Sequence, residues 1–365
     1  MHAAATTGMV LSLLVLVLVA VPLGSPGAAT TTVPPGATSG SRTFGTMTNI
    51  SYTSSVDGFP LSYEEVLPAH FRGNVNHSLL VYLHGAGSSS AIVRGGSGNG
   101  LTGSYLSNVT LAGRTLNELL VNASSFGFIV IAPSPRSAQG FYTNSTCLGP
   151  EEQDTVDAIH HEETIRHIQG VYALGDSMGS IAALSLAGHR HGLLLGVAIT
   201  GTITDAFEEF AYHPSPGSSL VAPTCGREPS ATNVTAQRTF AYLSVVRFDP
   251  KNFSGVRLWV AAGSLDRDTP NNASRWPFEM ANDTFLNSSC LVASTYGEPT
   301  NCTEPFSTLH LVNATAFVYR FFYEPTATHL IAQLDPKDMF DFFGSRLGGG
   351  CLETTFPPTV LGACP

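Results

Sequence analysis

The chain has 365 residues, only 12% of them are charged, and its formal net charge is −10. An acidic chain without a Lys/Arg cluster lacks the electrostatic signature of proteins that bind nucleic acid or anionic membranes, so we expect neither kind of partner. The length is sufficient for one large α/β domain with insertions.

The N-terminus carries an apolar run from Met9 to Leu23 that only Ser12 interrupts. This run is short for a bilayer span and typical of a signal-peptide core. Small residues suited to a cleavage site follow at Gly24, Gly27, Ala28 and Ala29. We therefore predict a signal peptide at residues 1–29, with an uncleaved signal anchor as the alternative, and no stable membrane span in the mature chain. Residues 30–45 are rich in Thr, Pro, Gly and Ser and predict a disordered lead-in.

Twelve Asn-x-Ser/Thr sequons favour export into a secretory pathway and a glycosylated product. They are Asn49, Asn76, Asn108, Asn122, Asn144, Asn233, Asn252, Asn272, Asn282, Asn287, Asn301 and Asn313. The alternative is a bacterial chain rich in Ser, Thr and Asn, in which the sequons are coincidental. Six cysteines, an even number, fit disulfides in an oxidising compartment. Fifteen pairings are possible, and proximity favours Cys290 with Cys302 and Cys351 with Cys364, leaving Cys147 to Cys225.

From residue 78 onward, short apolar runs alternate with helical segments. This alternation predicts an α/β fold with a mostly parallel central sheet flanked by helices. We expect strands at 78–83, 128–131, 171–174, 193–200, 256–262 and 316–323, and helices at 115–121, 154–168, 180–187 and 336–346. Residues 46–365 then form a single domain, with surface insertions or lids at about 201–252 and 271–310.

The motif Gly175-Asp176-Ser177-Met178-Gly179 matches G-x-S-x-G between a predicted strand and a predicted helix. In this context the serine occupies a tight turn that projects its Oγ above the sheet, and side chains at the two glycine positions would collide there. Ser177 is therefore the predicted nucleophile. The alternative is a glycine turn without a function.

The segment Leu83-His84-Gly85-Ala86-Gly87 (LHGAG) follows the first predicted strand. Backbone N–H groups in such a loop can stabilise a carbonyl oxygen that becomes charged during attack. We assign one donor to Ala86 and the second to Met178, the residue after the nucleophile. We interpret His84 as a residue that orders this loop, because it precedes the serine in the chain. The alternative for the segment is a flexible turn.

The acid and the base are expected after the last two strands, since triads built on a G-x-S-x-G serine follow the chain order Ser, Asp, His. Asp266 lies in GSLDRDTP after the strand 256–262, and Asp268 on the same loop is its competitor. His329 follows the strand 316–323, whereas His310 precedes it, so His329 is the predicted base. Neither an HExxH motif nor zinc-spaced cysteines are present, and we expect no metal and no cofactor.

Together LHGAG, GDSMG, GSLDRDTP and the His329 segment resemble the α/β-hydrolase superfamily over roughly residues 78–346. Within it the chain is most similar to the secreted feruloyl esterases, acetylxylan esterases and polyhydroxybutyrate depolymerases. The resemblance includes a short oxyanion loop and a helix ending in Phe after the catalytic histidine, here Met339-Phe340-Asp341-Phe342-Phe343. The chain departs from that group at Asp176 and Met178, where the group often has Leu and Ala or Asn, and in its two insertions.

These features predict a secreted serine hydrolase that cleaves carboxylic esters through a Ser177–His329–Asp266 triad and an acyl-enzyme. The expected partner is an ester substrate, either a small molecule or a polysaccharide- or polyester-linked group. Two alternatives stay open. One is a non-catalytic binding or adhesion glycoprotein with a hydrolase fold, and the other is a serine peptidase.

Overall fold

The computed structural model describes the chain from residue 44 in separate segments. They are residues 44–85, 90, 106–136, 150–201, 207, 233–245, 248, 250–253, 255–263, 308–310, 318–324, 334–344, 346–348 and 351–353. The predicted signal peptide, residues 1–29, lies outside them. Of the predicted lead-in, only Phe44 and Gly45 are described, and they begin the first strand. Most of the two predicted insertions also lies outside the described residues.

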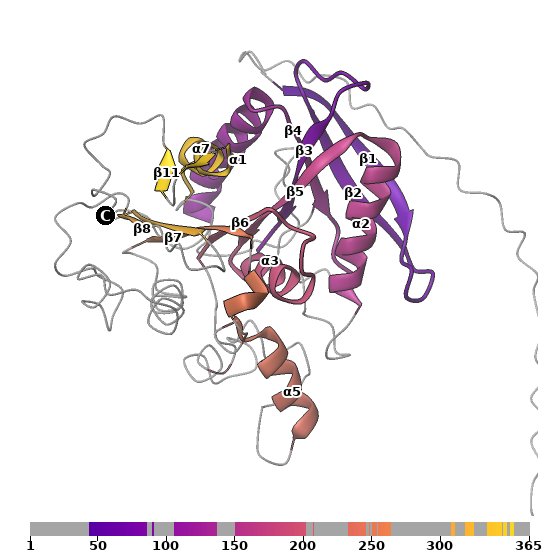
Figure 1. Ribbon diagram of the computed structural model, residues 1–365. Helices are drawn as coiled ribbons and strands as arrows, with labels where there is room; N and C mark the ends of the chain where they lie inside the picture. The colour runs from indigo at the N-terminus through magenta and orange to yellow at the C-terminus, as the bar shows by residue number, and fades with distance from the viewer. Residues whose placement is uncertain are drawn as a thin grey trace, which may run out of the picture.

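Nine strands among the described residues form one mixed sheet in the order β1-β2-β4-β3-β5-β6-β7-β9-β8 (Figure 1). The six central strands β4, β3, β5, β6, β7 and β9 are all parallel, and antiparallel strands lie at both edges. The strands are β1 (Phe44–Thr53), β2 (Pro60–Pro68), β3 (His77–Leu83), β4 (Phe128–Pro133), β5 (Ile168–Asp176), β6 (Gly196–Thr200), β7 (Arg257–Gly263), β8 (Thr308–His310) and β9 (Val318–Glu324). A separate ribbon pairs β10 (Arg346–Gly348) with β11 (Cys351–Glu353). The predicted fold class is confirmed.

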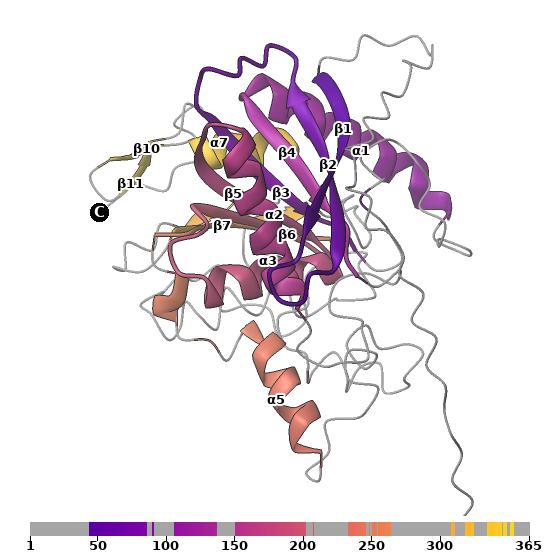
Figure 2. The ribbon, with the colours of Figure 1, turned by 90° about the vertical axis from the view of Figure 1, so that its right-hand side faces the viewer.

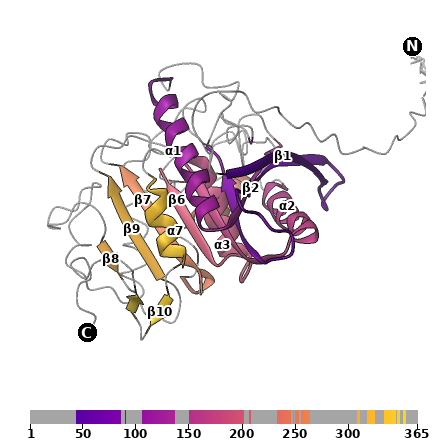
Figure 3. The same ribbon diagram turned by 90° about the horizontal axis from the view of Figure 1, so that it is seen from above.

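Helices cover both faces of this sheet (Figures 1 and 3). On one face lie α1 (Leu106–Ser125) and α7 (Pro336–Gly344), and on the other α2 (Glu151–Ile165) and α3 (Met178–His189). Strand β3 shows how the sequence builds both cores, since Leu79 and Val81 pack on the α2/α3 side while Leu80 packs on the α1/α7 side. This is the period-two alternation of a strand buried on both faces. No helix in the described part of the chain is long and apolar enough to span a bilayer.

Several predicted boundaries differ from the structure. Strands β1 and β2 were not predicted, and α1 starts nine residues before the predicted 115. The helix predicted at 154–168 ends at residue 165, because β5 already begins at residue 168 and pairs with β3. Part of the predicted insertion 201–252 is regular structure: α5 (Val234–Leu243) and the 3₁₀ helix η4 (Pro250–Phe253). Figure 2 shows α5 beyond α3, away from the sheet.

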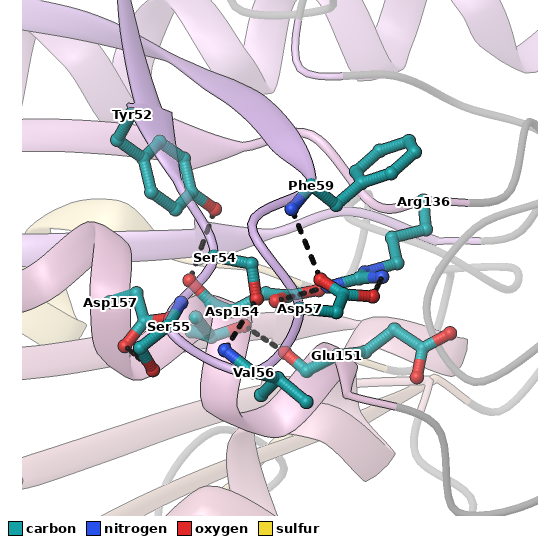
Figure 4. A network of polar contacts seen from close by, with 11 residues as sticks. Tyr52, Ser54, Ser55, Val56, Asp57, Phe59, Arg136, Glu151, Asp154 and Asp157 are labelled. Atoms are coloured by element: carbon teal, nitrogen blue, oxygen red, sulfur yellow. Dashed lines mark hydrogen bonds and ion pairs between the residues drawn. The ribbon is translucent and has the colours of Figure 1, made fainter.

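Helix α2 buries four carboxylates, at Glu151, Glu152, Asp154 and Glu162. The one at Asp154 is paired with Arg136, which follows β4 and also binds Asp57 in the turn between β1 and β2 (Figure 4). The Arg136 Nη1–Asp57 Oδ2 distance is 2.6 Å. Hydrogen bonding from Arg136 lowers the pKa of Asp57 to about 2. The guanidinium therefore fastens the β1–β2 hairpin to the first turn of α2.

Glu152 is satisfied differently, at the opposite side of α2. Its Oε1 accepts from Arg190 Nε at 2.8 Å, and its Oε2 accepts from the Tyr242 hydroxyl at 2.6 Å. The ring of His189 stacks on Tyr242 with centroids 3.9 Å apart and lies 2.8 Å, through Nδ1, from the same Oε2. Because Tyr242 belongs to α5, this carboxylate ties α5 to α2 and to the end of α3.

Glu162 is fully buried and accepts a hydrogen bond from the Tyr63 hydroxyl at 2.7 Å. Arg166 forms its short contact with Glu65 instead, at 2.7 Å, and lies 3.8 Å from Glu162. Burial, and then the negative charge of Glu65, raises the pKa of Glu162 from 4.5 to about 8. A carboxyl group whose folded-state pKa is raised holds its proton more tightly in the folded chain, so its contribution to stability falls as pH rises from about 4.5 to about 8.

We therefore expect Glu162→Gln, which mimics the protonated carboxyl, to remove part of this decline. From pH 5 to pH 8 the variant should gain about 2 kcal/mol of unfolding free energy relative to the wild type. Urea denaturation at the two pH values measures this difference. The matched control is Glu163→Gln at the exposed neighbouring position. An equal loss of stability in Glu162→Gln at both pH values would contradict the expectation.

Candidate active site

Ser177 occupies a sharp turn between β5 and α3. Its backbone has φ 55° and ψ −119°, and among the described residues it is the only non-glycine with a positive φ. Such a conformation costs roughly 1–3 kcal/mol and persists only where the surrounding structure enforces it. The side chain is 2% exposed. The predicted strand–turn–helix context of Ser177 is thus present, with the strain expected of a nucleophile elbow.

The two glycines of the motif are sterically required. A Cβ at Gly175 would lie 2.4 Å from the carbonyl oxygen of Gly179, and a Cβ at Gly179 would lie 1.9 Å from that of Leu83. Both contacts are with backbone atoms, which cannot rotate away. The motif therefore brings β3 and the start of α3 into closer contact than any other residue allows.

We expect Gly179→Ala to abolish catalytic activity and to destabilise the fold by about 3 kcal/mol or more, because β3 and α3 must separate. Gly344→Ala is the matched control, since a Cβ there meets no atom within 4 Å. Thermal unfolding and ester hydrolysis of both variants give the comparison. A Gly179→Ala protein as stable and active as Gly344→Ala would show that the elbow is not packed as described.

The end of β6 locks the elbow in place. The carbonyl oxygen of Thr200 accepts from the Ser177 N–H at 2.8 Å and from the Ser180 hydroxyl at 2.9 Å. Ser180 Oγ also lies 2.9 Å from the carbonyl oxygen of Gly175. The hydroxyl of Thr200 donates to Asp176 Oδ1 at 3.2 Å. These contacts were not predicted, since no motif marks Thr200 or Ser180 in the sequence.

The LHGAG segment reaches the nucleophile where β3 ends. A Cβ at Gly85 would lie 3.2 Å from the Cβ of Ser177, so the two backbones are close together. His84 is fully buried, and burial lowers its pKa to about 4. Its Nδ1 lies 2.9 Å from the carbonyl oxygen of Gly85, and it must donate because a carbonyl only accepts. The neutral imidazole therefore holds the carbonyl of Gly85, and its role in ordering the rest of the loop stays a prediction.

Of the two predicted oxyanion donors, the structure describes only Met178. Met178 is buried and is the first residue of α3. Because the first N–H groups of a helix have no acceptor within it, the Met178 N–H is not used by the hydrogen bonds of α3. Ala86 lies outside the described residues.

Asp266, its competitor Asp268, and His329 also lie outside the described residues. The strands before them are described. Gly263, the last residue of β7, pairs with Glu324, the last residue of β9. Asp266 follows Gly263 by three residues and His329 follows Glu324 by five. Parallel strands end at one edge of a sheet, so β7 and β9 end at the edge that carries Ser177.

No protein-family model and no curated protein sequence matches the chain. Solved structures do. An S-formylglutathione hydrolase from Agrobacterium tumefaciens matches with a TM-score of 0.51 and 15% identity, over 85% of this chain and 98% of that one. An acylaminoacyl peptidase from Pyrococcus horikoshii matches with a TM-score of 0.51 and 12% identity, over 83% of this chain and 40% of that one.

Prolyl oligopeptidase B from Galerina marginata matches with a TM-score of 0.52 and 12% identity, over 86% of this chain and 37% of that one. The chain thus spans about two-fifths of the length of the two peptidases and nearly all of the S-formylglutathione hydrolase. At these identities the likeness concerns the fold. Strand order, the strained serine between β5 and α3, and these structural matches agree on one conclusion: the chain has the α/β-hydrolase fold.

Proposed function

We propose that the chain is a secreted serine hydrolase that cleaves carboxylic esters. The observation that carries this proposal is the strained backbone of Ser177, with φ 55° at the turn from β5 into α3. A serine held at such cost, flanked by two glycines that no other residue can replace, supports a nucleophile better than a packing role.

In the proposed mechanism His329 removes the proton from Ser177, whose Oγ attacks the ester carbonyl. The N–H groups of Met178 and Ala86 stabilise the oxyanion, and Asp266 orients the imidazole and stabilises its charged form. His329 then protonates the leaving alcohol, and water releases the acyl group by the same steps. The start of α3 at Met178 adds the positive end of a helix dipole beside the developing anion.

We propose ester rather than peptide hydrolysis because LHGAG, GDSMG, GSLDRDTP and the His329 segment resemble secreted esterases, and because an S-formylglutathione hydrolase is among the structural matches. A panel of short-chain, long-chain and aryl esters, compared with peptide p-nitroanilides, tests the preference. We expect the best ester to exceed the best anilide in kcat/KM by at least about 100-fold, roughly 2.7 kcal/mol. The reverse order would make the chain a peptidase, and no turnover of either class would favour a binding glycoprotein.

We further propose that the mature protein begins near Thr30, carries N-glycans and has no free thiol. The apolar run before residue 24, the sequons and the six cysteines motivate this. After expression in a eukaryotic secretory host, intact mass spectrometry should show a shortened chain with a glycan mass that a glycosidase removes. Recovery of an unmodified full-length chain with six alkylatable thiols would contradict it.

A further inference from the structure

The elbow of this chain carries a carboxylate directly before the nucleophile. Asp176 is the last residue of β5, is 5% exposed, and pairs in register with Thr200 of β6. A carboxylate at this depth must be hydrogen-bonded, because burying an unsatisfied charge is costly. Its Oδ1 accepts from the Thr200 hydroxyl at 3.2 Å.

The second carboxylate oxygen of Asp176, Oδ2, lies near Gly85 at the end of β3. A Cβ built on Gly85 would lie 3.5 Å from Asp176 Oδ2, 3.3 Å from the carbonyl oxygen of Asp176 and 3.2 Å from Ser177 Cβ. The Gly85 backbone therefore lies close beside Asp176 and Ser177, with little more room than a methyl group between them. On its other side, the Gly85 carbonyl is held by His84 at 2.9 Å.

We propose that Asp176 is a positioning residue that connects the end of β6 to Gly85, where β3 has ended, and holds Gly85 at its working distance from Ser177. This inference rests on the proposed serine-hydrolase function and names a residue that the triad does not include. Oxyanion donors act only where they lie within hydrogen-bond distance of the charge that develops, so a shift of about 1 Å in this loop can cost about 100-fold in rate.

The sign of the effect separates positioning from electrostatics. A negative carboxylate near a developing oxyanion opposes its formation, so Asp176→Asn would accelerate the reaction if charge were the dominant influence. If the carboxylate instead holds the loop, the same substitution slows the reaction, because an amide N–H₂ replaces one of its two acceptor oxygens.

The experiment measures the rate at which a fluorophosphonate probe reacts with Ser177, together with kcat and KM for p-nitrophenyl acetate. Asp176→Asn should react at least about 30-fold more slowly with the probe and lose kcat by a similar factor, with KM changed less than about threefold. The matched control is Asp338→Asn. Asp338, on α7, is a similarly buried carboxylate that accepts a hydrogen bond from Trp259 Nε1 at 2.8 Å. This control should lower the melting temperature and leave the labelling rate unchanged.

The outcomes separate the two proposals. A wild-type protein that the probe does not label overturns the proposed function, and the role of Asp176 with it. A labelled wild type with Asp176→Asn reacting equally fast or faster overturns only the positioning role. A slower rate that merely follows a lowered melting temperature, as shown by the same loss in Asp338→Asn, also overturns it.

Discussion

Ser177→Ala is expected to lower the rate of ester hydrolysis by at least about 10⁴-fold. The remaining rate is the one that oxyanion stabilisation and substrate binding alone can supply. The substitution removes only Oγ. The backbone contacts that fix the turn, from the Ser177 N–H to Thr200 and from the Ser180 N–H to the Ser177 carbonyl, are kept. The melting temperature should therefore change little. Rates on one p-nitrophenyl ester and thermal unfolding of the purified variant are the measurements.

Two further serine variants sharpen this test. Ser177→Gly should be equally inactive but more stable than Ser177→Ala, because glycine adopts φ 55° without the cost that a Cβ brings. Ser185→Ala is the control on the same helix. Ser185 is fully buried, and its hydroxyl has no hydrogen-bond partner among the described residues, so its loss should leave the rate unchanged. Wild-type rates in Ser177→Ala would rule Ser177 out as the nucleophile.

The second large effect is expected at the acid. Asp266→Asn should lower kcat by about 10⁴-fold. Loss of the carboxylate that fixes the imidazole tautomer and stabilises its charge has an effect of this size in serine hydrolases. Asp268→Asn should change kcat less than about tenfold, roughly 1.4 kcal/mol. Asp266 is favoured because it lies three residues beyond Gly263, where β7 ends beside β9. Asp268 lies just before Thr269-Pro270, and the sequence favours a turn at this proline.

The two variants are compared on one ester under the same conditions. If Asp268→Asn is the inactive variant and Asp266→Asn is nearly normal, the two roles are exchanged. If neither loses more than about tenfold, the acid lies elsewhere and the interpretation of GSLDRDTP fails.

Strands β3, β4 and β6 could be predicted because each is an apolar run that is buried on both faces. β4 is buried at every position, and so is β6. The edge strand β1 could not be predicted in the same way, because its sequence FGTMTNISYT is polar and most of its side chains are exposed or half-buried. Its place in the sheet depends on pairing with β2, a tertiary contact that leaves no apolar periodicity in the sequence.

The polar core of α2 was also beyond sequence reasoning. Its buried carboxylates are satisfied by groups far along the chain: Tyr63 is 99 residues from Glu162, and Tyr242 is 90 residues from Glu152. A helix with six acidic residues predicts a solvated surface unless those partners are known. The elbow is the opposite case. Its serine and glycines lie within five consecutive residues, so the motif was sufficient to predict the turn, although Gly179 makes its close approach to Leu83 of β3.

Within the site, too, features set by neighbouring residues could be predicted, whereas contacts between residues far apart in the chain could not. The turn at Ser177 and its two glycines follow from one short segment, and the contact of His84 with Gly85 joins adjacent residues. The support of the elbow by Thr200 does not, because the residues it contacts lie about 20 positions earlier in the chain.

The most direct test of the central claim is covalent labelling of the wild-type protein with a fluorophosphonate, followed by peptide mass spectrometry. The probe reacts with serines that a neighbouring base activates and an oxyanion hole assists. The account predicts one adduct per chain, on the peptide that carries Ser177, and loss of ester hydrolysis in proportion to labelling. An unlabelled Ser177 in protein that hydrolyses esters, or an adduct on a different serine, would contradict it.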